Sequence, residues 1–160
     1  MSGETGDTTP PPDTSLKNIE IRLLGPDDAA VLDNVRPDTF DHAIIPAQAL
    51  AFVTSPLHKI AVAMDQGQVI ALASGVMMFH PDKRPIFFIA EVGVHDDFQR
   101  RDIGRAVTQA LIDAARADGP GGIWLATETD NDAARGLYSG LGARETSGVV
   151  VYDWDGAMDD

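Results

Sequence analysis

The sequence predicts an α/β domain built on a mixed sheet, and three observations lead to this fold class. Apolar, β-prone runs alternate with segments whose apolar residues recur at helical spacing. Glycine, proline and acidic residues separate these segments and mark turns and helix ends. The resulting order is β, α, α, β, β, β, α, β, α, β, β, with helices interleaved among the strands. With 160 residues, 44% of them hydrophobic, the chain has the size of one domain with a single substantial core.

The first half of the chain is predicted to contain four strands and two short helices. Pro26, Asp27 and Asp28 suit the first turn of a helix, because proline is tolerated there and acidic side chains stabilise helix N-termini. Gln66 and Gly67 separate two β-prone runs as a hairpin turn does. The predicted elements are a strand over Ile19–Leu24, a helix from Gly25 to about Val35, a helix from Pro46 to before Pro56, and strands over His58–Asp65, Gln68–Phe79 and Ile86–Val94.

The last of these strands contains two residues that do not suit a strand covered on both faces. Glu91 places a carboxylate inside the apolar run IFFIAEVGV, which indicates a functional site. Gly93 indicates either a β-bulge or the close approach of another segment.

The second half is predicted to begin with an amphipathic helix. Ile103, Val107, Leu111 and Ala114 recur at helical spacing, and the Gly-Pro pair at 119–120 ends the segment. The predicted elements are a helix over Ile103–Asp118, a strand over Gly122–Thr127, a helix over Asp132–Leu141, and two last strands within Ala143–Trp154 that turn near Ser147 and Gly148.

The chain is acidic, with a net charge of −13 at pH 7, and acids are concentrated at both ends. We predict a flexible acidic tail over residues 1–16, a single domain over residues 17–155, and a short acidic C-terminal tail over residues 156–160. An acidic body repels nucleic acid and anionic membranes, and it favours small cationic partners. Whether the protein forms a homodimer is left open.

The sequence contains no cysteine, which excludes disulfides, thiolate metal ligands and a thiol nucleophile. Its four histidines lack the spacing of metal ligands, so no metal site is predicted. No apolar run is long enough to span a membrane, and the N-terminus lacks a signal-peptide pattern. We therefore expect a cytoplasmic protein.

The junction EVGVHDDFQRRDIGR, residues 91–105, is the most informative segment. A strand ends there, and a helix begins after a loop that carries Gln99, Arg100 and Arg101. Free backbone N–H groups at the helix start, with the helix dipole and neighbouring arginines, suit an anion such as a pyrophosphate. The alternative is an N-capped helix with solvated arginines.

Two sequence motifs resemble those of the GNAT-type N-acetyltransferases. Gln99-x-x-Asp102-x-Gly104 is similar to the acetyl-CoA signature of this superfamily. The segment NDAARGLYSGLG, residues 131–142, resembles its second signature, in which an Asn precedes a Tyr by seven residues and a Leu-Gly pair ends the helix. Within the superfamily, the chain is most similar to the gentamicin-type aminoglycoside 3-N-acetyltransferases, through EVGV at 91–94 and YDWD at 152–155.

The resemblance implies a fold and a cosubstrate, acetyl-CoA. The fold is a mixed, mostly antiparallel twisted sheet with flanking helices, splayed at a β-bulge between the strands that end at Val94 and begin at Gly122. Gly93 is then expected to be the bulge. The residues expected to bind acetyl-CoA are Val92, Gly93, Val94, Gln99, Arg100, Arg101, Asp102, Ile103, Gly104, Arg105 and Asn131.

Asp102 departs from the signature, which has a glycine at that position. Its negative charge would lie beside the expected diphosphate, whereas its short side chain suits the N-cap of the following helix. The departure leaves two interpretations open: weaker acetyl-CoA binding, or an inactive acyl-CoA-binding module.

The resemblance also implies an acid–base pair. A primary amine must lose a proton before it attacks a thioester, and Glu91 is the expected base. Tyr138 matches the tyrosine that protonates the leaving thiolate. Each residue also has an interpretation without a catalytic role. Glu91 would then be an exposed strand glutamate, and Tyr138 would be a tyrosine packed on the core.

The expected acceptor is an aminoglycoside or another polycationic amine. Asp153 is the expected ammonium contact, and Glu128 and Asp41 are weaker candidates. A protein N-terminus, a lysine or a polyamine is the alternative acceptor.

Overall fold

A computed structural model describes residues 16–159 and contains one five-stranded sheet with the spatial order β1-β2-β3-β4-β5. Strands β1 to β4 pair antiparallel, and β5 pairs parallel to β4. This arrangement confirms the predicted mixed, mostly antiparallel sheet. Residues 1–15 and 160, which include most of the predicted N-terminal tail, lie outside the described residues. The strands are β1 (Ile19–Leu23), β2 (His58–Asp65), β3 (Gln68–Met78), β4 (Ile86–Val94) and β5 (Gly122–Trp124).

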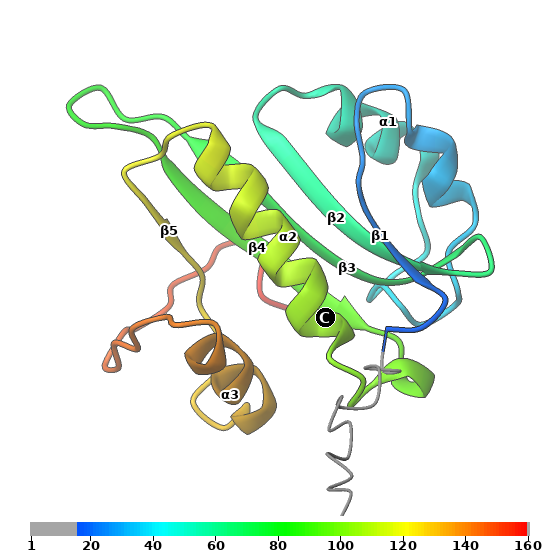
Figure 1. Ribbon diagram of the computed structural model, residues 1–160. Coiled ribbons are helices and arrows are strands. Elements are labelled where there is room, and N and C mark those ends of the chain that lie inside the picture. Colours follow the sequence, from blue (N-terminus) through cyan, green and yellow to red (C-terminus); the bar gives the residue numbers. More distant parts are fainter. Residues whose placement is uncertain (1–15, 160) are drawn as a thin grey trace, which may run out of the picture.

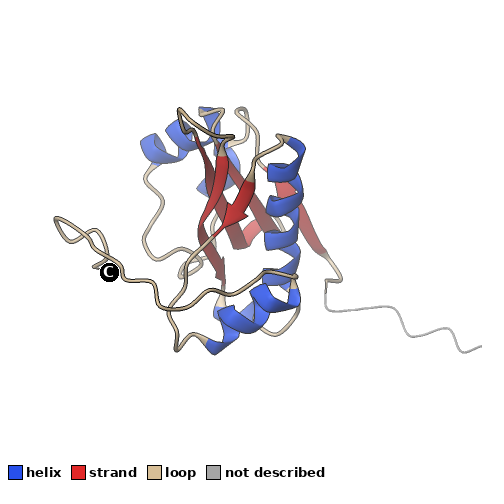
Figure 2. Ribbon diagram, turned by 90° about the vertical axis from the view of Figure 1, so that its left-hand side faces the viewer, coloured by secondary structure: helices blue, strands red, loops and turns tan. Residues whose placement is uncertain are grey.

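Helices cover both faces of the sheet (Figures 1 and 2). α2 (Ile103–Ala117) lies along one face, where its apolar stripe forms a core with the central strands. Ile103, Val107 and Leu111 belong to that core as predicted, but its last residue is the buried Ala115 and not the predicted Ala114, which is only half-buried. The short helix η1 (Ala29–Asp33) and α1 (Pro46–Thr54) lie on the other face, over a second core cluster that includes Val62 and Leu72. α3 (Asp132–Gly140) follows β5.

The sheet splays between β4 and β5. Their pairing covers only Ile86 to Phe88 opposite Gly122 to Trp124, and the two strands separate beyond it. On the other edge of β4, the pairing with β3 shifts by one residue, so that Ala90 has no partner between Ile89 and Glu91. The predicted strand Gly122–Thr127 is therefore shortened to three paired residues, because β4 no longer offers it a partner.

The bulge lies at Ala90 and not at Gly93, which corrects the prediction. Gly93 pairs regularly with Leu72. The alternative reading of this glycine, the close approach of another segment, fits the structure. A Cβ atom at Gly93 would lie 3.1 Å from the carbonyl oxygen of Thr39, so a side chain there would push that loop away from β4.

The helix predicted from Gly25 to Val35 is also shorter than expected. The structure has a 3-10 helix over Ala29–Asp33. The carboxylate of Asp28 accepts a hydrogen bond from the Gly25 amide (2.7 Å), so this acid closes a turn and does not lie inside a longer helix. The other predicted helices agree with the structure to within one or two residues.

The two last strands predicted within Ala143–Trp154 are absent from the structure. This segment runs unpaired, and Figure 2 shows its end extending from the body of the molecule. The side chains of Val149, Val150 and Val151 are 75%, 71% and 61% exposed. Three β-branched residues favour extended backbone, but a strand also needs a partner within hydrogen-bonding distance. A cavity of about 840 Å³ separates the beginning of this segment from β5 and α2.

Among residues 16–159, no helix has the length and apolarity needed to cross a membrane.

Candidate functional site

A cavity of about 270 Å³ lies where β4 and β5 separate. It brings together the bulged part of β4, the segment after β5, α3 and the loop between η1 and α1. Glu91 and Tyr138, the two predicted catalytic residues, both line this cavity. The residues that line it are Thr39, Phe40, Asp41, Leu72, Ile89, Ala90, Glu91, Val92, Gly93, Leu125, Ala126, Thr127, Asn131, Ala134 and Tyr138.

The bulge at Ala90 determines how Glu91 is presented. In β4 before the bulge, half-buried and buried positions alternate, whereas Ala90 and Glu91 are both exposed. An extra residue in a strand changes the direction of the side chains beside it. Desolvation raises the pKa of Glu91 above its ordinary value, the nearby charge of Asp41 raises the pKa further, and His42 lowers it. A carboxylate with a raised pKa is a better proton acceptor at neutral pH.

Tyr138 lies on α3 and contacts both cavities, because it lines the 270 Å³ cavity and the larger cavity beside β5. Burial raises the pKa of its phenol above the ordinary value. The hydroxyl therefore stays protonated at neutral pH and is available as a proton donor. A carboxyl group with a raised pKa and a protonated phenol thus line one cavity.

The open edge of β4 presents the backbone groups of Val92 and Val94. The His95 amide donates to the carbonyl oxygen of Ile70 on the β3 side (2.9 Å). Backbone groups of successive residues in a strand point to opposite sides, so those of Val94 and Val92 point to the side from which β5 has separated. The side-chain amide of Gln99 lies 3.5 Å from the carbonyl oxygen of Val94.

The loop before α2 has an unusual backbone. Arg100 and Asp102 have φ angles of 61° and 58°, in the left-handed region that glycine adopts most easily. Alternation between right- and left-handed residues turns successive N–H groups toward one concave side, which suits an anion. Asp102 is the N-cap of α2, but its side chain makes no capping hydrogen bond. The predicted capping role of this carboxylate is therefore wrong, because the left-handed backbone replaces the extended conformation that a side-chain cap uses.

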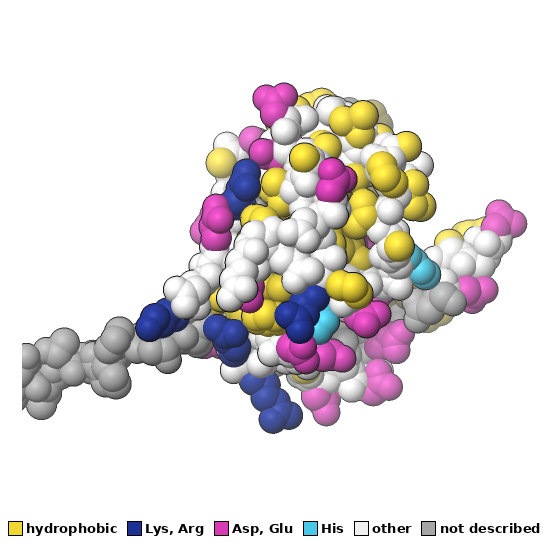
Figure 3. Space-filling model, turned by 90° about the vertical axis from the view of Figure 1, so that its right-hand side faces the viewer, with side chains coloured by type: hydrophobic (Ala, Val, Ile, Leu, Met, Phe, Trp, Pro, Cys, Tyr) yellow, Lys and Arg dark blue, Asp and Glu magenta, His cyan; other side chains and the backbone are white. Residues whose placement is uncertain are grey.

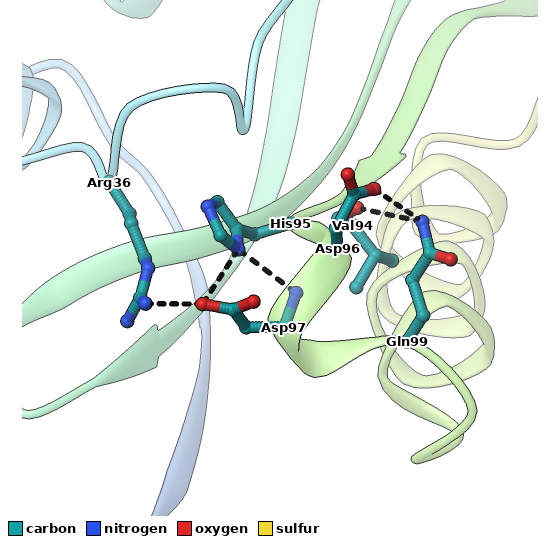
Figure 4. A network of polar contacts seen from close by, with 6 residues as sticks. All are labelled: Arg36, Val94, His95, Asp96, Asp97 and Gln99. Carbon is teal, nitrogen blue, oxygen red and sulfur yellow. Dashed lines mark hydrogen bonds and ion pairs between the residues drawn. The ribbon is translucent and has the colours of Figure 1, made fainter.

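A network of polar contacts holds the start of this loop (Figure 4). Arg36 forms an ion pair with Asp97 (2.5 Å), whose backbone amide donates to the imidazole of His95 (3.1 Å). Gln99 donates to a carboxylate oxygen of Asp96 (3.1 Å). Arg36 therefore ties the loop between η1 and α1, which lines the cavity, to the loop that leads into α2.

The three predicted arginines have different environments. Arg100 is exposed. The guanidinium of Arg101 lies 5.6 Å from the ring centre of Phe98, and that of Arg105 donates to the carbonyl oxygen of Gly140 at the end of α3 (3.2 Å). On the face in Figure 3, basic side chains gather along the lower edge beside acidic ones. Arg105 thus links the first turn of α2 to the end of α3.

Gly104 and Ile103, in the first turn of α2, are packing residues. A Cβ atom at Gly104 would lie 3.3 Å from Val94 and 3.8 Å from Leu137, so glycine lets α2 approach β4 and α3. Ile103 is 1% exposed. Only their backbone N–H groups remain available to an anion.

The structure does not bring all predicted residues to one place. Asn131 lines the 270 Å³ cavity, and its side-chain oxygen also caps α3 by accepting from the Ala134 amide (3.1 Å). Asp153 lines neither cavity, and its carboxylate accepts from the Met158 amide (3.1 Å).

In the described part of the chain, no three acidic or histidine side chains gather as a metal-binding group.

Sequence reasoning placed substrate specificity in the loop from Arg36 to Pro46 and in the last strands, but it did not single out Thr39 within that loop. This residue is 6% exposed, and its hydroxyl has no hydrogen-bond partner within the described residues. No local pattern indicates this position. Asp41, named only as a weaker substrate contact, lines the same cavity as Glu91.

A family model matches most of the chain. The sequence profile of the acetyltransferase (GNAT) family matches residues 29–143, which include the cavity, the loop before α2 and α3. The chain belongs to this family.

Curated relatives match part of the chain. Over an aligned segment of 66 residues, this chain is 38% identical to the ribosomal protein bS18-alanine N-acetyltransferase of Escherichia coli K12. The segment covers 41% of this chain and 43% of that enzyme. The mycothiol acetyltransferase of Nocardia farcinica is 37% identical over 79 residues, 49% of this chain and 26% of that enzyme. The chain therefore aligns with less than half the length of these relatives.

Solved structures match over most of the chain. An aminoglycoside acetyltransferase from an uncultured soil metagenomic sample is 20% identical, with a TM-score of 0.69 over 85% of this chain and 97% of the other. The aminoglycoside N-acetyltransferase AAC(6')-Iy, in complex with the bisubstrate analogue CoA-S-monomethyl-acetylneamine, is 17% identical, with a TM-score of 0.70 over 85% and 97%. At such identities these likenesses establish the fold.

Proposed function

We propose that the protein is an N-acetyltransferase that transfers acetyl directly from acetyl-CoA to a primary amine. The observation that carries the proposal is that Glu91 and Tyr138 line one cavity at the splay of the sheet, the former with a carboxylate and the latter with a protonated phenol. Membership of the GNAT family supports acetyl-CoA as the cosubstrate.

The two residues fit the proton movements of this reaction. Glu91 attracts the ammonium form of the acceptor and takes one proton from it, which leaves a neutral amine. A bond then forms between the amine nitrogen and the acetyl carbonyl carbon, and the thioester C–S bond breaks. Tyr138 gives its proton to the departing sulfur, and the nitrogen loses its second proton to bulk water, which leaves a neutral amide. Solvent returns a proton to Tyr138 and takes the proton that Glu91 had accepted, so that one proton is released for each ammonium acetylated. The absence of cysteine from the sequence favours this direct transfer over an acyl-cysteine route.

The residues of the chain suit the cosubstrate. Open backbone groups of Val92 and Val94 can pair with an amide-containing arm as a neighbouring strand would. The N–H groups between Arg100 and Arg105, at the start of a 15-residue helix, suit a diphosphate. Asn131 lines the same cavity as Val92.

Asp102 provides a test of this assignment, because it puts a negative charge in the proposed diphosphate loop. Two like charges about 5 Å apart repel by ~0.8 kcal/mol in water and by ~3 kcal/mol at an effective dielectric of 20. Since Asp102 is exposed, we expect Asp102→Gly to tighten acetyl-CoA binding by about 3- to 10-fold at low salt. Isothermal titration calorimetry measures this change.

The matched control for this experiment is Asp82→Gly, which removes the same charge in the turn between β3 and β4, beyond the opposite end of β4. It should leave the affinity unchanged. Because Asp102 has a left-handed backbone and no capping bond, the thermal midpoint of Asp102→Gly should not fall by more than ~2 °C. Equal affinities in the wild type and Asp102→Gly would show that the carboxylate does not act on the diphosphate.

For the acceptor, we propose an aminoglycoside or another polycationic amine. The net charge of −13 favours cations, and Asp41 lies beside Glu91 at the cavity. The motif resemblance to gentamicin-type 3-N-acetyltransferases supports the 3-amino group as the acceptor position, and Asp153 remains a proposed contact for an ammonium outside the cavity. The second candidate is the amino terminus of a protein, which the similarity to the bS18-alanine N-acetyltransferase favours.

An amine panel with a CoA-thiol release assay tests these proposals. Polycationic amines should show a KM that rises several-fold between 20 and 200 mM salt, because charges are screened within about 8 Å at physiological ionic strength. The KM of a monoamine should change little. Turnover only with peptides that carry a free N-terminus would select the second candidate, and thiol release that never depends on an amine would indicate an acyl-CoA-binding module.

A further inference from the structure

Residues 149–154, which we call the C-terminal arm, form an apolar segment that the rest of the described chain leaves uncovered. Contiguous exposed apolar residues mark a surface for interaction, and β-branched and aromatic residues favour a strand. The arm therefore has the composition of a strand whose partner is missing. Its large apolar side chains are between 61% and 78% exposed, and they are Val149, Val150, Val151, Tyr152 and Trp154.

A groove of suitable length lies along β5. One edge of β5 pairs with β4, and among residues 16–159 no strand pairs with its other edge. The cavity of about 840 Å³ is lined by eight successive residues, 122–129, and by residues 143–147 across from them. Six residues of a strand span about 20 Å and eight span about 26 Å, so the arm fits along this groove.

The lining of the groove matches the arm in polarity and in charge. Ile112 of α2 and Leu125 are apolar, line the cavity and are only partly buried. Arg116 and Arg144 also line it, and neither side chain makes a hydrogen bond or ion pair within residues 16–159. The arm is followed directly by Asp155. An apolar strand with an acidic end therefore suits an apolar groove with two free guanidinium groups.

The arm of the same copy does not occupy this groove. Val149 is the one residue of the arm that lines the cavity, and Figure 2 shows the segment extending from the body of the molecule. A two-residue hairpin turn that would return the arm needs a positive φ at its first central residue. At the predicted turn, Ser147 does not have a positive φ, whereas Gly148 has one of 84°. The backbone at this turn therefore directs the arm away from its own groove.

We infer that two copies of this chain exchange their C-terminal arms, so that the arm of each copy inserts between β5 and residues 143–147 of the other. The free edge of β5 then gains a strand, and the apolar side chains of the arm cover α2. A two-fold axis fills both grooves in the same way, and the assembly closes as a dimer. The inserted arm also covers Tyr138 on the side of the larger cavity, which this residue lines.

The oligomeric state tests whether the arm forms the interface. Analytical ultracentrifugation of the full chain at micromolar concentration should show a dimer. Val151→Asp puts a charge where the arm would be buried, and it should raise the dissociation constant of the dimer by at least about 100-fold. Leu50→Asp is the matched control, because Leu50 is a 53% exposed apolar residue on α1, on the other face of the sheet. It should leave the dimer unchanged.

A wild type that stays monomeric at every concentration would overturn the inference. A dimer that persists in Val151→Asp would also overturn it, and dissociation in Leu50→Asp instead would assign the interface to α1. Val151 is 61% exposed, so its substitution leaves the fold of one copy intact, which circular dichroism checks.

Cross-linking tests whose groove the arm enters. The sequence contains no cysteine, so introduced cysteines report single contacts to a short bis-maleimide. Ala126→Cys marks the middle of the groove, and Val151→Cys marks the middle of the arm. When the two single variants are unfolded together and refolded, they should give a covalent dimer in which mass spectrometry finds these two positions joined. Ala126→Cys refolded with Leu50→Cys is the control and should give no such link.

The double variant with Ala126→Cys and Val151→Cys separates exchange from return to the same copy. Exchange predicts links between two chains. Links confined to one chain would show that the arm folds back into its own groove, and the absence of any link would show that the groove does not bind the arm; either result overturns the inference. None of these measurements needs an acceptor amine, so they decide the exchange of arms independently of the proposed acetyl transfer.

Discussion

Glu91→Gln should lower kcat with a primary amine by roughly 100- to 1,000-fold at pH 7, in the range of a general base. The substitution keeps the shape of the side chain and removes its ability to accept a proton. The deficit should shrink as the pH rises toward the pKa of the amine, ~10, because more of the acceptor is then already neutral. A pH–rate profile of the variant and the wild type measures this.

The same variant should be at least as stable as the wild type at neutral pH. The pKa of Glu91 is raised in the folded protein, so the folded state holds this proton more tightly than the unfolded state does. The associated stability is fully present below the unfolded pKa of about 4.3 and is lost as the pH rises through the folded pKa. At pH 7 the charged carboxylate is therefore mildly unfavourable, and glutamine removes this effect.

Glu20→Gln is the matched control, since Glu20 is an exposed strand glutamate on β1 at a distance from the site. It should leave the rate and its pH dependence unchanged. A deficit in Glu91→Gln that stays constant from pH 6 to 10 would assign Glu91 to substrate positioning and remove it from proton transfer.

Tyr138→Phe should lower kcat by roughly 10- to 1,000-fold and leave the affinity for acetyl-CoA nearly unchanged. The ring fills the same space, and only the proton donor for the leaving sulfur is lost. Because burial raises the pKa of this phenol, the wild-type rate should not fall until the pH exceeds 10. Steady-state kinetics with direct acetyl-CoA titration separates the two effects.

The chain supplies its own control for this substitution. It has two tyrosines, and Tyr152 is 78% exposed. Tyr152→Phe should change neither kcat nor affinity. An unchanged kcat in Tyr138→Phe would assign that residue to packing between α3 and the cavity.

Local pattern predicted the elements that form the centre of the sheet and its main helix. The hairpin of β2 and β3 follows from apolar, β-prone runs on either side of Gln66 and Gly67, and α2 follows from apolar residues at helical spacing. Val107 and Leu111 of that stripe are fully buried. The hairpin and the helix depend on residues that are close together in the sequence. They could therefore be predicted without knowledge of the tertiary structure.

Long-range contacts account for the corrections. The bulge at Ala90 depends on the register between β3 and β4. The need for glycine at position 93 comes from the close approach of Thr39, which lies more than fifty residues away in the chain. The strands predicted within Ala143–Trp154 failed for the same reason. Their residues favour extended backbone, but the position of a partner strand is not encoded locally.

The sequence by itself determined the kinds of chemistry available to this protein: a carboxylate in an apolar strand, arginines before a helix, a tyrosine on α3 and no thiol. Only the tertiary structure decided which of these groups meet, because the convergence of β4, α3 and the loop after η1 on one cavity depends on how the sheet splays. It also decided that Asp102 adopts a left-handed backbone and that the Thr39 hydroxyl is buried without a partner. Both depend on how distant segments pack, and no periodicity or motif along the chain records that packing.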